Sequence, residues 1–197
     1  MHGHQPGSRL RLKKGAVEQL LSAPPAEAVV LYADQSEVGL YPPVGAQWNP
    51  RGQQAKIRTH GRNQKVYLFG ALEAHRGKLY VGCWPRKDSA AFVDFLQALL
   101  AALPQGPIYL ILDNYGVHKS KRTREFLAGE GERIHLVFLP TYAPWLNRIE
   151  ATWRLVKAKA GTNAWRDTLA QLIADYQATL VAWQAHLLHP TSCFLSE

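Results

Sequence analysis

Short apolar runs broken by polar turns recur along the chain and predict β-strands. The runs are rich in Val, Ile, Leu, Tyr and Phe and are bounded by glycine, proline or charged residues, a pattern typical of strands buried in a sheet. His75-Arg76-Gly77 separates two of them, which favours a hairpin. The predicted strands are residues 28–34, 38–42, 65–74, 78–84, 108–114 and 134–140.

Apolar residues at helical spacing predict helices between and after the later strands. Asp88 or Ser89 is expected to cap the first helix, and Pro104 follows its end. The last helix carries an apolar stripe from Leu169 to Leu187, which we expect to pack against the sheet, with dimerisation as the lesser alternative. The predicted helices are residues 88–103, 120–131, 147–161 and 165–188.

The order of these elements predicts an α/β domain. An antiparallel start of three strands is followed by parallel strands alternating with helices, which favours a mixed sheet flanked by helices. Ligands in such sheets bind at the carboxyl ends of the parallel strands. We expect the domain to cover residues 29–197, after a basic leader, residues 1–28, that contains a short helix at residues 15–23.

The charge of the chain favours a polyanionic partner. Lys and Arg total 23 against 15 Asp and Glu, a formal net charge of +8 that suits nucleic acid or an anionic membrane surface. Basic residues cluster without any acid within residues 51–65 and 119–124. A solvated surface would explain any one cluster, but their repetition favours nucleic acid.

Several classes of protein are disfavoured by what the sequence lacks. No apolar run is long enough to span a bilayer, and the N-terminal segment has no apolar core of a secretory signal, so we expect a cytoplasmic protein without a membrane partner. The patterns GxxxxGK[ST], GxGxxG, HExxH and GxSxG are all missing. Their absence argues against an ATPase, a dinucleotide-dependent enzyme, a zinc protease and a common serine hydrolase.

Three acidic residues stand out by their positions. Asp34 closes the apolar run 28–34, Asp113 lies at the end of the predicted strand 108–114, and Glu150 lies in the first turn of a predicted helix. Mg²⁺ prefers oxygen ligands and is usually held by one or two carboxylates together with substrate phosphate. Two such ions can serve an in-line displacement at phosphorus. The positions therefore predict a metal site built from distant carboxylates.

Each of these acids also has a structural explanation. The two aspartates could close Asx turns after their strands. Asn147 could cap a helix, with Glu150 completing a capping box or pairing with Arg154. Glu37 is a rival ligand to Asp34, although it falls in the predicted turn.

Residues 110–120 and 136–157, "LILDNYGVHKS" and "LVFLPTYAPWLNRIEATWRLVK", together resemble the catalytic core of mariner-type transposases, especially their bacterial insertion-sequence branch. The Asp-Asn-x-x-x-His and Pro-x-Tyr-x-Pro-x-Leu-Asn-x-x-Glu signatures are specific only in combination. The Trp-Asn-Pro-Arg-Gly loop at residues 48–52 resembles the region after the family's first aspartate. The resemblance covers roughly residues 30–160.

This resemblance implies a ribonuclease-H-like fold and a catalytic triad of Asp34, Asp113 and Glu150, which would also be the metal ligands. The implied cofactor is Mg²⁺ or Mn²⁺, with two ions per site. Water would first cleave a phosphodiester at a transposon end, and the freed 3′-hydroxyl would then attack target DNA. The implied partners are the transposon ends, a TA-containing target and a second copy of the chain, so that a homodimer of a mobile insertion sequence would act at the bacterial nucleoid.

The basic clusters and the resemblance together predict contacts with DNA. The predicted DNA-binding residues are Arg51, Lys56, Arg58, Arg62, His118, Lys119, Lys121, Arg122 and Arg148. His118 could instead support the metal site, and Asn114 and Asn147 are expected to support the metal ligands or to form turns. Trp48 and Trp145 are candidates for stacking on a base.

The sequence departs from the family in two ways. Arg148 stands where the family usually has a proline at a helix start, a position that proline suits. Family members also carry helix-turn-helix modules before the core, for which residues 1–28 leave no room, so this part is expected to be lost, separately encoded, joined by a frameshift or trimmed away. A non-catalytic DNA-binding or assembly remnant, and a ribonuclease-H-like nuclease without joining activity, remain as alternative functions.

Overall fold

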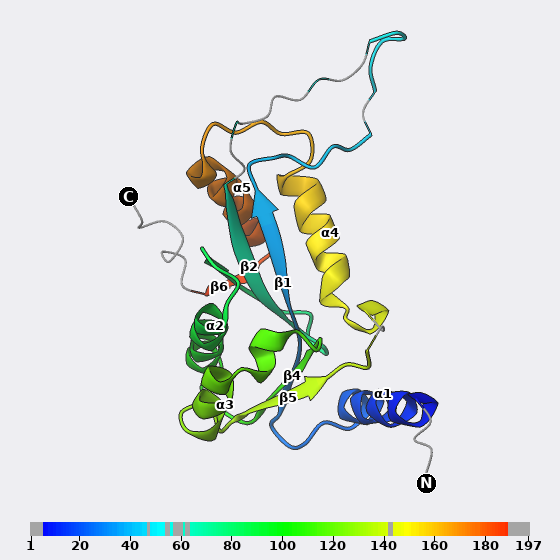
Figure 1. The fold of residues 1–197 in the computed structure, drawn as a ribbon, viewed down its shortest axis with the longest axis vertical. Helices are drawn as coiled ribbons and strands as arrows, with labels where there is room; N and C mark the ends of the chain where they lie inside the picture. The colour runs from blue at the N-terminus through cyan, green and yellow to red at the C-terminus, as the bar shows by residue number, and fades with distance from the viewer. Residues whose placement is uncertain are drawn as a thin grey trace.

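The structure is a computed structural model, and it describes residues 6–46, 48–53, 56, 61, 64–141 and 144–188 (Figure 1). The strands are β1 (Val29–Gly39), β2 (Lys65–Glu73), β3 (Leu79–Trp84), β4 (Ile108–Leu112), β5 (Ile134–Phe138) and β6 (His186–Leu188). The helices are α1 (Pro6–Ser22), α2 (Ser89–Ala102), α3 (Lys121–Ala128), α4 (Ile149–Ala160) and α5 (Leu169–Ala182), with 3₁₀ turns η1 (Gly116–Lys119) and η2 (Pro144–Leu146).

The described strands form one mixed sheet in the order β5-β4-β1-β2-β3-β6. β1, β2 and β3 pair antiparallel in sequence, as the hairpin pattern predicted. β4 and β5 then add parallel to β1 on its other side, after the crossover through α2. The predicted α/β mixed sheet is therefore confirmed, and β1 is its central strand.

The first strand is longer than predicted. Residues 28–34 and 38–42 were expected to form two strands, but β1 runs without interruption from Val29 to Gly39, so Asp34 lies inside a strand and not at its end. β2 pairs with β1 as far as Gly39, whereas β4 pairs with it only from Val29 to Tyr32. The apolar run 28–34 contains the part of β1 that pairs with β4, whereas the more polar remainder of the strand pairs with β2 alone among the described strands.

The C-terminal segment is also different from the prediction. The predicted helix 165–188 is shorter, because α5 begins at Leu169, where Thr168 is the N-cap and forms a capping box with Gln171, and ends at Ala182. The chain then turns through Gln184, whose positive φ is 57°, into β6. β6 pairs parallel with β3, a long-range pairing that helical periodicity along the segment could not indicate.

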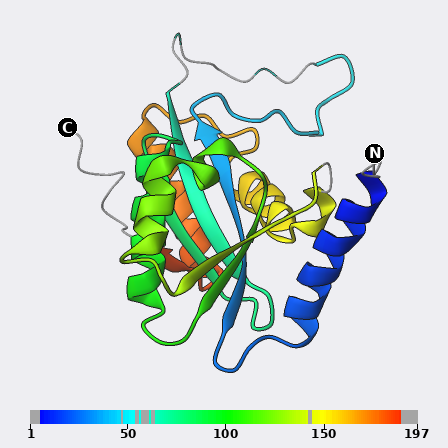
Figure 2. The same cartoon turned by 60° about the horizontal axis from the view of Figure 1, so that its bottom comes forward.

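Two helical layers cover the sheet, one on each face, as Figure 2 shows. α2 packs Phe92, Phe95 and Leu96 against one face, together with Phe126 of α3. α4 and α5 cover the other face, and the apolar stripe of α5 is buried there through Leu172, Ile173, Tyr176 and Leu180, as predicted. Side chains of β1 alternate between the layers: Leu31 and Ala33 face α2, whereas Val30 and Tyr32 face α4. By this alternation Asp34 belongs to the α4 face.

The segment before β1 contains a longer helix than the short one predicted for the leader. α1 extends from Pro6 to Ser22, beyond the predicted residues 15–23, and Val17 joins the core on the α4 side. None of the described helices is both long and apolar enough to cross a membrane.

Candidate active site

The carboxyl ends of the parallel strands bring Asp34 and Asp113 together. Asp113 follows β4 directly, and Tyr32 of β1 is in register with Ile111 of β4. Continuing this parallel register by two residues places Asp34 beside Asp113. Both side chains belong to the α4 face, because Ile111 packs in the same core cluster as Tyr32.

Gly70 allows α4 to approach this part of the sheet. Gly70 of β2 lies opposite Asp34 across the antiparallel pair. A Cβ atom at Gly70 would lie 2.6 Å from two ring atoms of Trp153 in α4 and 3.2 Å from Cδ1 of Ile149. The missing side chain therefore lets α4 pack closely at this point, with Ile149 fully buried and the neighbouring Glu150 exposed in the first turn.

The pKa of Asp34 responds to the charges of the other two acidic residues. Burial raises the pKa of Asp34 to about 6, and the negative charges of Asp113 and Glu150 add to the increase. The backbone N–H of Gln35 and the positive charge of Lys87 act in the opposite direction on this pKa. Asp34, from the centre of the sheet, thus lies within electrostatic reach of the other two carboxylates.

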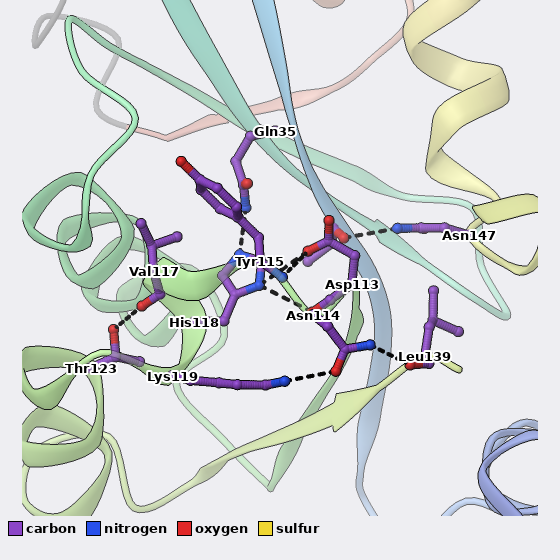
Figure 3. Close-up of polar contacts among 11 residues, drawn as sticks. Gln35, Asp113, Asn114, Tyr115, Val117, His118, Lys119, Thr123, Leu139 and Asn147 are labelled. Carbon is purple, nitrogen blue, oxygen red and sulfur yellow. Dashed lines mark hydrogen bonds and ion pairs between the residues drawn. The ribbon is translucent and has the colours of Figure 1, made fainter. Parts of the chain in front are cut away.

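Asp113 is held by the turn that follows it (Figure 3). Its Oδ1 accepts a hydrogen bond of 3.0 Å from the backbone N–H of Tyr115, and Nδ1 of His118 lies 3.3 Å from the same oxygen. The hydrogen bond from His118 lowers the pKa of Asp113, although burial opposes it. The Asx turn considered from the sequence is therefore present, but Oδ2 has no hydrogen-bond partner in the described part of the chain and 60% of the side chain is exposed.

His118 supports Asp113 from a buried position. Only 2% of His118 is exposed, which disfavours the predicted contact with DNA and favours the alternative of support for the acidic site. Gln35 Nε2 lies 2.9 Å from His118 Nε2, and the Phe92 ring lies 4.5 Å from the imidazole centroid. Because an amide N–H donates, His118 Nε2 accepts and its Nδ1 carries the proton toward Asp113.

The structural explanations for Glu150 are not observed. Asn147 does not cap α4: its Nδ2 donates to the carbonyl of Ala33, 3.0 Å away, and its Oδ1 is buried without a partner among the described residues. Arg148 occupies the N-cap position and makes no side-chain cap. Within the described residues Glu150 makes no ion pair, with Arg154 or any other residue, so its carboxylate is available.

Asn114, which was predicted to support the metal ligands or form a turn, and Glu37, the rival of Asp34, make structural contacts instead. Asn114 donates to the Leu139 carbonyl (2.7 Å) and accepts from Lys119 Nζ (2.7 Å), so it joins the ends of β4 and β5 and does not contact the Asp113 carboxylate. Glu37, the rival of Asp34, forms an ion pair of 2.7 Å with Lys65. The structure therefore favours Asp34 over Glu37 as the first acid of the site.

The predicted DNA-binding residues are spread around this end of the molecule. Arg122 is exposed on α3, where Lys121 pairs with Glu125 at 3.6 Å, and Lys119 lies 4.6 Å from the Phe138 ring centroid. Arg148 is exposed at the start of α4, across the sheet from α3. In the segment between β1 and β2, Arg51, Lys56 and Trp48 are exposed, whereas Arg58 and Arg62 lie outside the described residues. Trp145 is also exposed.

Lys87 is a residue that the sequence reading missed. It lies in the loop between β3 and α2, its Nζ is 4.5 Å from the centroid of the Tyr115 ring, and its charge lowers the pKa of both Asp34 and Asp113. Nothing in "PRKDS" distinguishes this lysine from other surface lysines. Gln35 was missed for a similar reason, since its hydrogen-bond partner is distant in the sequence.

The acids are not arranged as a closed metal cage. Among the described residues, no three side chains of His, Cys, Asp or Glu are close enough together to hold one ion by themselves. The arrangement offers instead one half-buried and two exposed carboxylates at one end of the sheet.

Comparison with known proteins agrees with this architecture. Residues 29–173 match the family described as DDE superfamily endonuclease. The chain belongs to this family. It is 35% identical over 162 residues to a Shigella sonnei protein named insertion element IS630 uncharacterized 39 kDa protein, covering 82% of this chain and 47% of that protein. The chain therefore spans about half the length of this relative.

Solved structures show the same fold. The Mos1 transposase in a paired-end complex with the left transposon end superimposes with a TM-score of 0.65 at 15% identity, over 93% of this chain and 55% of that chain. The catalytic domain of Mos1 mariner transposase gives 0.59 at 14% identity, over 93% and 82%. The predicted resemblance to a DDE-type transposase catalytic domain and the predicted ribonuclease-H-like fold are thus confirmed.

Proposed function

We propose that this DDE-family domain is a transposase catalytic domain that cleaves DNA and joins the cut end to a target. The main support is the register that brings Asp34 beside Asp113 toward the carboxyl ends of parallel strands, where such sheets bind their ligands, with Glu150 of α4 within electrostatic reach of Asp34. The membership of the family and the positive net charge agree with this proposal. We take residues 29–197 as the catalytic unit and expect it to act on DNA in the bacterial nucleoid.

The chemistry of the acids fits Mg²⁺ or Mn²⁺. Hard cations take carboxylate oxygens, and Mg²⁺ is usually held by only one or two of them with water and substrate phosphate, so an open arrangement is suitable. Solved complexes of the Mos1 relative include one with Mn and one with Mg. Asp34 and Asp113 would hold the ions and Glu150 would complete the site. When bound, a pair of ions would activate an attacking oxygen and stabilise the leaving oxygen.

The residues of the chain have separate tasks in this proposal. Asp34 projects from the middle of a strand that is paired with β2, so its position is rigid. His118 and the Tyr115 N–H keep the Asp113 carboxylate ionised and oriented. The exposed basic residues, Arg122 and Arg148 among them, would hold backbone phosphates on either side of the acids. Cleavage by water and attack by a 3′-hydroxyl are both phosphoryl transfers and can use the same positioned acids.

The test is nicking of supercoiled DNA in Mg²⁺ or Mn²⁺ by the wild type, by Asp113→Asn and by Asp94→Asn. Asp94 is an exposed aspartate on α2 that lies outside the site, so it is the matched control. The wild type and Asp94→Asn should nick DNA, whereas Asp113→Asn should bind DNA without cutting it. Equal nicking by all three proteins would remove Asp113 from the mechanism.

A strand-transfer assay with pre-cleaved ends separates a transposase from a nuclease. Transfer of the labelled end into a target supports the transposase, and cutting without transfer supports a nuclease that lacks joining activity. A chain that binds DNA but neither cuts nor joins would be a non-catalytic assembly protein. We further propose that the active complex is a homodimer on paired ends, and that recognition of specific ends is supplied by parts beyond residues 1–197.

A further inference from the structure

Lys87 is fixed in position by the start of α2. The next residue, Asp88, is the N-cap, and its Oδ1 accepts a hydrogen bond of 3.0 Å from the Ala91 N–H. α2 is anchored by fully buried side chains, including Phe92 and Leu96. The backbone of Lys87 is therefore tied to a rigid element, unlike that of a lysine in the middle of a long loop.

The side chain of Lys87 reaches the turn that holds Asp113. Its Nζ lies 4.5 Å from the centroid of the Tyr115 ring, a cation–π distance. The backbone N–H of Tyr115 in turn donates to Oδ1 of Asp113. β3 runs parallel to β1 and β4, so the loop after β3 lies at the same end of the sheet as the acidic residues.

The positive charge of Lys87 is not neutralised by direct contact. It lowers the pKa of both Asp34 and Asp113, so it lies within electrostatic reach of two carboxylates. In the part of the chain that the structure describes, however, Lys87 forms no ion pair. Lys65 and Lys121, by contrast, both contact a glutamate. The half-buried Lys87, whose ammonium stacks on a ring and contacts none of the described carboxylates directly, is suited to bind a further anion.

We propose that Lys87 binds a backbone phosphate of DNA next to the acidic residues Asp34 and Asp113. This inference rests on the proposed function, because it assigns a substrate contact within the same site. A phosphodiester that approaches three carboxylates is repelled by them, and a fixed ammonium beside them offsets this repulsion. The Tyr115 ring holds the ammonium close to the two carboxylates but disfavours a direct ion pair with either of them.

The test is the salt dependence of DNA affinity, measured by fluorescence anisotropy without divalent ions. Lys87→Ala is compared with Lys78→Ala, since Lys78 Nζ also stacks on a tyrosine, 5.0 Å from the Tyr80 centroid, but lies before β3 at the opposite end of the sheet. Both variants lose a similar cation–π contact. Only Lys87→Ala should lower the slope of log K against log salt, by about 0.9 for one phosphate contact.

Lys87→Arg should retain most of the slope, because a guanidinium also binds phosphate. A slope for Lys87→Ala equal to that of wild type and Lys78→Ala would overturn the inference while the proposed function stands. If the wild type binds DNA but does not nick it, the proposed catalysis fails, and the slope comparison still tests Lys87. Absence of DNA binding by the wild type would overturn both proposals.

Discussion

Asp34 and Asp113 lie side by side at the end of the parallel strands, yet the pKa values of the two carboxyl groups are shifted in opposite directions. Asp34 projects from inside β1, and burial raises its pKa to about 6. Asp113 lies in the turn after β4, where His118 and a backbone N–H lower its pKa. For Asp34 burial outweighs the hydrogen bond from the Gln35 backbone N–H, whereas for Asp113 the hydrogen bonds from His118 and the Tyr115 N–H outweigh burial. The balance between burial and hydrogen bonds thus determines which of the two acids is stably ionised without a cation.

This difference has a consequence for the proposed metal site. The ionised Asp113 would be ready to receive a cation, whereas Asp34 would first have to lose a proton, which it does only as the pH rises through about 6. Cation binding should therefore weaken as the pH falls through about 6, mainly because of Asp34.

Asp34→Asn is expected to have the largest effect, with opposite signs for activity and stability. Metal-dependent nicking should fall to background, because an amide is a poor replacement for a carboxylate ligand. In the absence of metal at about pH 8, the change should increase the free energy of unfolding by up to roughly 3 kcal/mol, since folding no longer buries a charge. Thermal unfolding of the two proteins, followed by circular dichroism, measures the gain.

The pH dependence of this gain has a defined sign. The pKa of Asp34 is raised from 3.8 to about 6, so proton-linked stability is fully present below 3.8 and is lost as the pH rises through 6. The advantage of Asp34→Asn should therefore disappear in acid. Asp113→Asn should show no such advantage, because the pKa of Asp113 is lowered. A less stable Asp34→Asn protein at pH 8 would contradict the comparison.

Gln35→Leu tests how the turn holds Asp113 and should have the next largest effect. Without the amide, His118 Nε2 loses its buried partner, and the tautomer that donates to Asp113 is no longer selected. Nicking should fall by about 10- to 100-fold, the usual cost of removing such a partner. The ¹⁵N shifts of the His118 ring nitrogens should show the change of tautomer directly.

Thr123→Val is the matched control for Gln35→Leu. Thr123 is fully buried and its Oγ1 donates to the Val117 carbonyl in the same turn, 2.8 Å away, without contacting His118. Both variants should lower the melting temperature, but only Gln35→Leu should alter the His118 spectrum. Identical spectra for Gln35→Leu and the wild type would mean that Gln35 has a packing role alone.

Gly70→Ala tests the burial of Asp34 and should have the smallest effect on activity. The added Cβ would meet the Trp153 ring at 2.6 Å, so α4 has to shift, at a cost of about 1–3 kcal/mol. The shift should expose Asp34 and bring its pKa back toward 3.8. The control is Gly15→Ala in α1, where no atom lies within 4 Å of the new methyl and a gain of about 0.5–1 kcal/mol is expected.

The sequence predicted those strands and helices that are marked by a pattern of residues close together in the chain. The apolar run before Asp113 and the periodicity of α2 correspond to β4 and a helix capped by Asp88, because both patterns reflect burial of neighbouring residues. The full length of β1 was missed, since Gln35 and Ser36 are polar although both are buried. β6 was missed because β3, its neighbour among the described strands, is distant in the chain.

By itself, the sequence singled out Asp34, Asp113 and Glu150 through the family resemblance, and local patterns specified most of the strands and the helix that carry them. Tertiary structure alone decided what each acid can do. Asn147 donates to the Ala33 carbonyl and does not cap α4, His118 is directed at Asp113 by Gln35, and α4 packs closely over Gly70, opposite Asp34. Ionisation depends on burial and on hydrogen-bond partners, and here both come from segments far apart in the chain.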